Sequence, residues 1–184
     1  MSITNCPFRG TRDYFHSASL FGACLAHLRE RGIEPTDIDF IFNKRVAVQA
    51  DLTDDPVDGP LVAAFSFDGG KVSAIETNVP ITRNEPYDED GLAATFIPVD
   101  GGLEVDLGKT TNPFIDCVVA AFKAVLLKRD STKKYVFARM KLQRIPNRKF
   151  SVLFSRPIGR FLEGSIQVDG VVVGQIYYGV WSSN

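Results

Sequence analysis

Cysteine and histidine are scarce in this chain of 184 residues, which contains three Cys and two His. The three cysteines (Cys6, Cys24 and Cys117) are odd in number and far apart in the sequence. They predict neither a disulfide framework nor a zinc site, and they fit a reducing, cytoplasmic compartment. We expect no bound metal and no resident cofactor.

Long apolar runs are also missing. None reaches roughly 18 residues, the length that a membrane-spanning helix needs, and residues 1–12 lack the apolar core of a signal peptide. The net charge is −1, so the bulk charge predicts neither nucleic acid nor an anionic membrane as a partner. There is no glycine-rich phosphate loop, no Gly-x-Ser-x-Gly elbow and no His-Glu-x-x-His helix.

Phenylalanine is abundant, with 14 copies. A large aromatic core and an apolar ligand tunnel both account for such a composition, and composition alone leaves the two open.

One pattern occurs twice. Two stretches with helical spacing of apolar residues superpose with a constant offset of 94 residues. Each is followed by alternating, strand-like segments and by two strands joined through Asp-Gly, a typical hairpin turn. The paired stripes are Leu20, Phe21, Cys24, Leu25 and Leu28 in the first half, and Phe114, Ile115, Val118, Val119 and Phe122 in the second.

The pattern predicts two helices and nine strands. The first helix spans 17–31 with Gly32 after its end, and the second runs to Arg129, with Asn112 as its cap and Pro113 at its first position. The strands are predicted at 38–48, 61–67, 72–77, 94–99, 103–107, 135–143, 150–154, 161–168 and 171–181, and the acidic stretch 51–60 is predicted to be a loop.

Residues 80–91 form the expected linker between the halves, because they combine Pro80, Pro86 and Gly91 with a run of acids. We therefore expect an α+β protein with a first half at 1–85 and a second half at 92–184, packed as one compact body.

The order of hairpin, helix and antiparallel strands resembles the hotdog fold, and two copies in one chain resemble a double hotdog, with two helices each wrapped by an antiparallel sheet. The segment from Asn112 to Ala120 is similar to the start of the second-half helix in double-hotdog dehydratases of polyketide assembly lines. That resemblance implies that Asp116 is the catalytic acid. Ala120 stands where those dehydratases carry Gln or His.

The segment from Asp13 to Leu20 resembles the helix entry of hotdog thioesterases, where an Asp precedes a His or Asn. The resemblance implies Asp13 as a nucleophile or base and His16 as a proton-transfer group. We expect His16 and Asp116 to form an acid/base pair at a cleft between the halves. The structural alternatives stay open: a helix-start histidine without a role, a carboxylate stabilised by the helix dipole, and Asp13 as an N-cap.

Basic residues suggest a rim for the phosphates of a substrate carried by coenzyme A or phosphopantetheine, or for an acidic acyl carrier protein. Solvated strand edges carry the same residues for solubility, and this alternative is open. The candidate substrate-binding residues are Asn112, Lys44, Arg45, Arg148, Arg156 and Arg160.

The sequence thus predicts an enzyme acting on small acyl thioesters, either dehydratase-like or thioesterase-like. A non-catalytic protein that binds an acyl or aromatic ligand is the main alternative, and a lyase or isomerase of small aromatic acids is a third. A monomer and a homodimer are both open.

Overall fold

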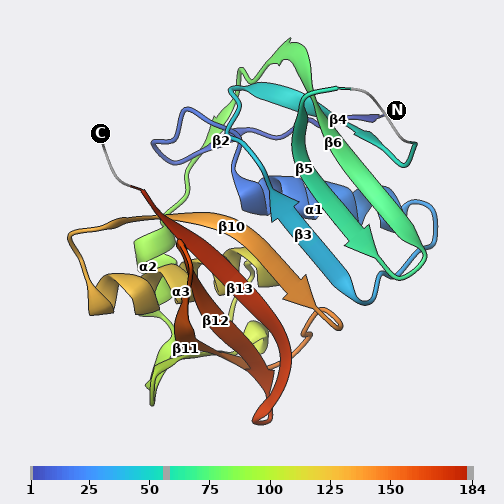
Figure 1. The fold of residues 1–184 in the computed structure, drawn as a ribbon. Coiled ribbons are helices and arrows are strands. Elements are labelled where there is room, and N and C mark those ends of the chain that lie inside the picture. The colour runs from blue at the N-terminus through green and yellow to red at the C-terminus, as the bar shows by residue number, and fades with distance from the viewer. Residues whose placement is uncertain (1, 56–58, 182–184) are drawn as a thin grey trace. The chain divides into compact units, whose positions relative to one another are not determined.

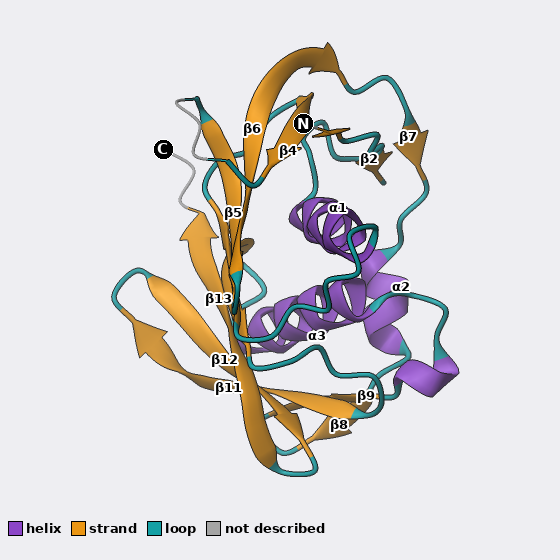
Figure 2. Ribbon diagram, turned by 90° about the vertical axis from the view of Figure 1, so that its right-hand side faces the viewer, coloured by secondary structure: helices purple, strands orange, loops and turns teal. Residues whose placement is uncertain are grey.

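The computed structural model describes residues 2–55 and 59–181. The chain divides into two compact units, Met1–Tyr87 and Asp88–Asn184. Each unit is built from one main helix packed against an antiparallel sheet (Figures 1 and 2). The α+β class predicted from the repeated pattern is therefore confirmed.

The first unit has a five-stranded antiparallel sheet in the order β1-β4-β6-β5-β3, and β2 pairs with β7 separately. Helix α1 precedes the last four strands of this sheet. The elements are β1 (Ser2–Ile3), β2 (Phe8–Arg9), α1 (Ser17–Arg29), β3 (Ile38–Phe42), β4 (Val48–Thr53), β5 (Leu61–Phe67), β6 (Gly70–Pro80) and β7 (Asn84–Glu85).

Helix α1 ends in a glycine motif that the sequence predicts. The Ile33 N–H donates to the Leu28 carbonyl and the Gly32 N–H donates to the Arg29 carbonyl, at 3.0 and 2.9 Å. These are the two bonds of a Schellman motif, and Gly32 adopts the left-handed conformation that it requires, with φ 72°. The apolar stripe of α1 is buried.

A phenylalanine cluster fills the space between α1 and its sheet. The rings of Phe21, Phe40 and Phe65 lie 5.3 to 6.1 Å apart, and each side chain is at most 1% exposed. Tilted and edge-on rings at this spacing stabilise a core beyond the area that they bury. In this unit the abundant phenylalanine therefore forms an aromatic core.

The single strand predicted at 38–48 is wrong, because the chain leaves the sheet after Phe42. The N–H groups of Asn43 and Lys44 both donate to the Val62 carbonyl, which turns the backbone away from β5. A second strand, β4, then runs into the segment predicted as a loop, and its Ala50 and Leu52 are almost fully buried.

The second unit has a six-stranded antiparallel sheet in the order β8-β9-β11-β12-β13-β10. Its main helix, α3, lies against this sheet (Figure 2). The elements are α2 (Glu89–Ala94), β8 (Ile97–Val99), β9 (Gly102–Val105), a 3-10 turn η1 (Leu107–Lys109), α3 (Phe114–Arg129), β10 (Lys134–Leu142), β11 (Phe150–Ile158), β12 (Phe161–Val168) and β13 (Val171–Trp181).

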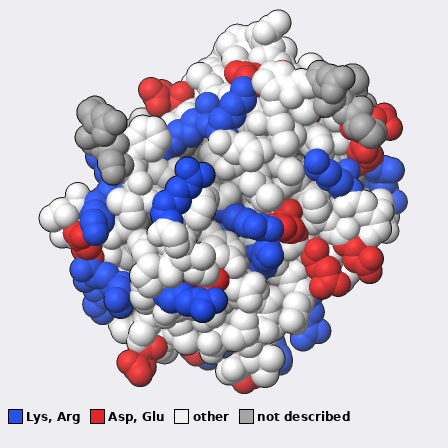
Figure 3. Space-filling view, in the orientation of Figure 1, with Lys and Arg blue, Asp and Glu red and all other residues white. Residues whose placement is uncertain are grey.

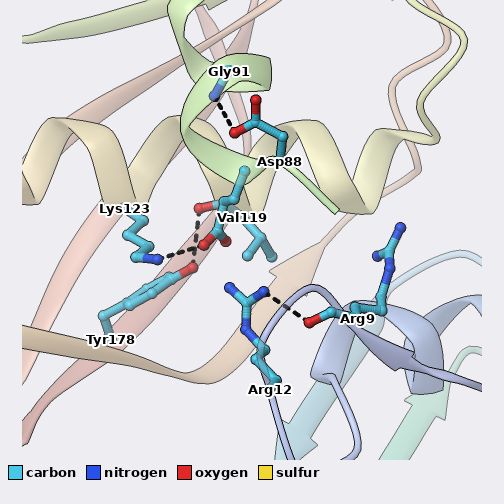
Figure 4. Close-up of polar contacts among 8 residues, drawn as sticks. Arg9, Arg12, Asp88, Gly91, Val119, Lys123 and Tyr178 are labelled. Atoms are coloured by element: carbon cyan, nitrogen blue, oxygen red, sulfur yellow. Dashed lines mark hydrogen bonds and ion pairs between the residues drawn. The ribbon is translucent and has the colours of Figure 1, made fainter. Parts of the chain in front are cut away.

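The short helix α2 occupies the place where the sequence predicts linker and strand. The Asp88 side chain caps it by accepting a hydrogen bond from the Gly91 N–H at 2.8 Å (Figure 4). The acids after the cap suit the positive end of the helix dipole. The predicted strand at 94–99 is therefore shortened to β8.

Close packing at Gly164 of β12 holds α3 against its sheet. The ring of Phe122, a fully buried side chain, lies so near Gly164 that a Cβ added there would be 2.4 Å from a ring atom. The hydroxyl of Tyr178 donates to the Val119 carbonyl of α3 at 3.0 Å (Figure 4). These contacts identify the inner face of the sheet.

The two units share a helix followed by four antiparallel strands, but they pair the strands differently. In the second unit β10 pairs with the last strand, β13, whereas in the first unit β3 pairs with the third, β5. In the first unit, strand β6 lies between β5 and β4. Its residues 70–75 pair with β5 and its residues 73–80 pair with β4, so one long strand serves two staggered neighbours.

A matched pair of glycine substitutions tests this packing. We expect Gly164→Ala to lower the free energy of unfolding by about 1–3 kcal/mol, because the added methyl group overpacks against Phe122. Gly22→Ala in α1 meets nothing within 4 Å, so it should raise stability by about 0.5–1 kcal/mol. Urea denaturation monitored by circular dichroism measures both changes, and a neutral effect of Gly164→Ala would contradict the packing described.

Candidate functional site

Asp116 lies in the first turn of α3 and is 1% exposed. Its N–H and that of Cys117 donate to the Pro113 carbonyl at 3.0 and 3.2 Å. A carboxylate in this place is stabilised by the positive end of the helix dipole, and its burial keeps water from screening the charge. The residue that the sequence singled out is thus a buried acid at a helix start.

Asn112 does not cap α3, contrary to the prediction. Pro113 is the N-cap residue, with no side-chain cap. The Asn112 side-chain amide donates instead to the Thr110 hydroxyl at 3.1 Å. Proline fixes the extended backbone at the helix entry, so the entry forms without an amide cap.

The thiol next to Asp116 is held protonated. Burial raises the pKa of Cys117 to about 11, and the charge of Asp116 adds to the rise, while a hydrogen bond with Thr110 lowers it. The Cys117 Sγ donates to the Asn112 carbonyl at 3.7 Å. A thiol with this pKa is a poor nucleophile at neutral pH.

His16 is the N-cap residue of α1 and is 5% exposed. Its backbone is extended, and its carbonyl accepts the hydrogen bond of the Leu20 N–H at 3.1 Å. Its ring lies 5.6 Å from the ring of Tyr87. His16 and Asp116 therefore hold similar places, each buried at the start of the main helix of its own unit, and their pairing stays a prediction.

Two arginines surround Tyr87 in the first unit. The guanidinium carbons of Arg9 and Arg12 lie 4.1 and 5.4 Å from the centre of its ring, and Arg12 also donates to the Arg9 carbonyl (Figure 4). Cations over an aromatic face are attracted by its π electrons. With the His16 ring against the same tyrosine, the entry to α1 gathers three basic side chains that the sequence pattern did not connect.

Asp13 is exposed, three residues before the helix N-cap. The prediction that it caps α1 is wrong, because His16 takes the cap position. An exposed carboxylate lacks the desolvated environment that activates a nucleophile, so Asp13 is the weakest of the three acid/base candidates.

The first two basic candidates, Lys44 and Arg45, interact with other residues of the first unit. Lys44 forms an ion pair with Glu76, and the guanidinium of Arg45 lies 4.4 Å from the centre of the Tyr14 ring. These contacts fit a structural role for both residues.

The second basic group does not form one rim. Arg148 precedes β11 and pairs with Asp169, whereas Arg160 follows β11 and lies 5.0 Å from the centre of the Phe161 ring. The nine residues of β11 separate them, at about 3.3 Å per residue. Arg156, on β11, is 3.6 Å from Glu163.

Helix α2 adds a buried acid that the sequence pattern missed. Glu89 is 7% exposed and forms an ion pair with Lys123 of α3. Lys123 lies seven residues after Asp116, which places both on one side of α3. The signal for Glu89 was hidden because its acidic surroundings are typical of a linker.

A cavity of about 560 Å³ lies at the other end of α3. Its walls come from α2, the β8–β9 hairpin and the last turns of α3, and most of them are apolar. Its volume falls in the usual range of small-ligand sites. The main lining residues are Ala93, Phe96, Pro98, Leu103, Ala124 and Leu127, with Asp90, Lys128 and Arg129 as the charged members.

Within 2–55 and 59–181, no three His, Cys, Asp or Glu residues gather as metal ligands. No helix in this part of the chain has the length and apolar character needed to cross a membrane.

No protein-family model and no curated protein matches the sequence. In structure, the chain is similar to the pyran synthase domain from module nine of the sorangicin pathway, with a TM-score of 0.50 and 8% identity over 96% of this chain and 92% of that one. The chain has the double-hotdog fold. At this identity the likeness concerns the fold alone.

Two further solved structures resemble this double hotdog. The tesB protein of Mycobacterium avium subs paratuberculosis has a TM-score of 0.49 and 11% identity over 96% of this chain and 91% of that one. The dehydratase domain from the CurF module of Curacin polyketide synthase has a TM-score of 0.47 and 11% identity over 91% and 84%.

The cysteine environments yield a chemical test. Burial also raises the pKa of Cys6 to about 11, although Arg9 and Arg83 lower it, and burial raises that of Cys24. Against an ordinary thiol pKa of about 9, Cys6 and Cys117 should hold roughly a hundredfold less thiolate at pH 8. We therefore expect slow alkylation by iodoacetamide in the native protein and fast alkylation in urea, measured by mass spectrometry.

The same shifts predict a loss of stability in alkali. The folded pKa of Cys6 and Cys117 lies above the unfolded value. The contribution of these two thiols to the free energy of unfolding is therefore complete below about pH 9 and is lost as the pH rises toward 11. In the alkylation test, rapid reaction of Cys6 or Cys117 with iodoacetamide at pH 8 without denaturant would contradict the burial described.

Proposed function

We propose that this double hotdog acts on acyl thioesters, with Asp116 as the acid/base carboxylate and His16 as the second proton-transfer group. The observation that supports it is the buried Asp116 carboxylate in the first turn of α3. Burial and a helix dipole act together on this carboxylate, as they do on many catalytic acids and bases.

The start of α3 also offers backbone N–H groups as hydrogen-bond donors. Backbone N–H groups in the first turn of a helix point along its axis, and they stabilise negative charge that develops on a carbonyl oxygen. A thioester carbonyl at this end of α3 would be polarised while the carboxylate moves a proton. A base and an oxyanion site are the two parts that both hydrolysis and dehydration need.

Hydrolysis is the reaction that the surroundings of Asp116 favour. The dehydratases that the start of α3 resembles carry a Gln or His one turn after the Asp. Ala120, one turn after Asp116, is buried and offers only a methyl group. In hydrolysis Asp116 takes a proton from water, the hydroxide adds to the thioester carbonyl, and the thiolate leaves with that proton.

We propose two possible carriers of the acyl group: coenzyme A, and the phosphopantetheine of an acyl carrier protein. Arg148, Arg156 and Arg160 are exposed cations of the second unit, and phosphate groups bind such side chains. Because these residues lie along the length of β11, we expect each to contribute separately.

Ligand binding without catalysis is the second candidate, and the cavity of about 560 Å³ favours it. The cavity begins at Ala124, eight residues after Asp116, which is about 12 Å along a helix. Its apolar walls suit an acyl chain or an aromatic ring.

Asp116→Asn tests the hydrolytic proposal. The amide keeps the shape of the side chain and cannot accept a proton, so we expect kcat for an acyl-CoA panel to fall by about 10²–10⁴-fold. Turnover is followed by release of free thiol. The matched control is Asp55→Asn, which changes an exposed carboxylate in a loop of the first unit and should leave both turnover and the melting temperature unchanged.

His16→Gln is expected to reduce turnover as well, because Gln cannot shuttle a proton at neutral pH. If His16 and Asp116 serve one step, the double variant should be little worse than the more damaged single variant. Full turnover in Asp116→Asn with an unchanged melting temperature would reject the proposed role.

Filling the cavity separates the two candidates. Ala124→Phe should weaken binding of an acyl ligand at the cavity, seen as a loss of its thermal shift, without the kcat defect of Asp116→Asn. A thermal shift in the native protein with no product formed, abolished by Ala124→Phe, would favour binding without catalysis.

A further inference from the structure

The sheet of the second unit has an outer face that is open to solvent. Because side chains alternate along a strand, the inward Tyr178 places Tyr177, Gly179 and Trp181 of β13 on the opposite side. In Figure 1 the strands β10, β12 and β13 lie in front of α3, so the viewer looks onto this outer face. Trp181 is 52% exposed.

Three aromatic residues form a row on the outer face. Phe161 pairs with Gly179 across the β12–β13 ladder, and two atoms of its ring would lie 3.9 Å from a Cβ at Gly179. The glycine thus leaves room for the ring to lie over the strand. Tyr177 and Trp181, two residues to either side of Gly179, are the diagonal neighbours of Phe161, at about 7–8 Å in Cα spacing.

Cations flank this aromatic row. The register places Arg139 and Glu163 opposite Tyr177, and Lys134 opposite Trp181. Strand β11 adds Arg156 beside Glu163, and the turn before β12 adds Arg160, whose guanidinium carbon lies over the Phe161 ring, 5.0 Å from its centre. Lys141 completes the set at the level of Gln175.

The face is therefore basic. It carries the five cations Lys134, Arg139, Lys141, Arg156 and Arg160. Its acids are Glu163, whose side chain is only 13% exposed, and Glu104 of β9, which lies 3.9 Å from Lys149. Figure 3, in the same orientation as Figure 1, shows Lys and Arg gathered over these strands. The net charge of the whole chain conceals this. The second unit has 13 Lys and Arg against 10 Asp and Glu, and the first has 8 against 12.

We propose that this outer sheet face binds single-stranded nucleic acid. Successive bases stack on evenly spaced aromatic rings, while Lys and Arg beside the rings neutralise the phosphates. Exposed aromatic rings with cations beside them match the stacked bases and the phosphates of a single strand at the same time. The proposal uses the opposite face of the sheet from Tyr178 and α3 and does not depend on Asp116 or His16, although Arg156 and Arg160 belong to both proposals.

Trp181 is the single tryptophan of the chain and serves as the probe. Titration with a twelve-nucleotide oligo(dT) at low salt should quench its fluorescence as a base stacks on the indole ring. If four phosphates are contacted, raising salt from 50 to 200 mM should weaken binding by roughly fiftyfold. A duplex of the same length should bind more weakly, because its bases are already stacked.

Substitutions locate the binding site. Binding of a fluorescein-labelled oligo(dT) to each variant is measured by fluorescence anisotropy. Trp181→Ala should weaken binding by about tenfold, and Trp181→Phe should retain most of it. Lys141→Glu should weaken binding, whereas Lys71→Glu, the same change at an exposed lysine of β6, should have a much smaller effect.

Three outcomes would overturn the proposal: no binding at 50 mM salt, equal effects of Lys141→Glu and Lys71→Glu, and binding that is insensitive to Trp181→Ala. The last result, together with equally tight binding of polyglutamate, would identify the face as a dock for an acidic protein.

Discussion

The burial of one helix against the inner face of one sheet is the constraint on which each unit depends. In the second unit, Phe122 packs on Gly164 and Tyr178 reaches the backbone of α3. These contacts decide which residues of β12 and β13 point inward. Since strand side chains alternate, they also decide which residues point to solvent, so the aromatic and basic row on the outer face follows from the same packing that holds the helix.

The position of Asp116 follows from this constraint as well. A helix with a narrow apolar stripe leaves its other sides in water, but residues 114–122 of α3 are all buried. The ion pair of Glu89 with Lys123 shows that α2 covers part of the side on which Asp116 lies. Enclosure changes an ordinary helix-start acid into a desolvated carboxylate, the physical basis of the proposed chemistry.

Strong local signals made much of the fold predictable. The stripes of α1 and α3, Gly32 after α1, Pro113 before α3 and the Asp-Gly turns all act within a few residues. Helix α2 was missed because its six residues are too few to show a period, and its acids resemble a linker. The break after Phe42 depends on the Val62 carbonyl, a contact that adjacent residues do not reveal. Asp116 and His16 were selected by resemblance, whereas their burial, and the scatter of the arginines along β11, arise from tertiary packing.

The long strand β6 has a consequence for how the first unit opens. Among the described strands of that sheet, it alone joins the β1–β4 pair to the β3–β5 pair. Local fluctuations at either edge can break one ladder and leave the other intact, but detachment of β6 breaks both at once. Amide hydrogens at the centre of β6 should therefore exchange with solvent only through the largest opening of the unit, whereas those of β1 and β3 exchange through smaller ones.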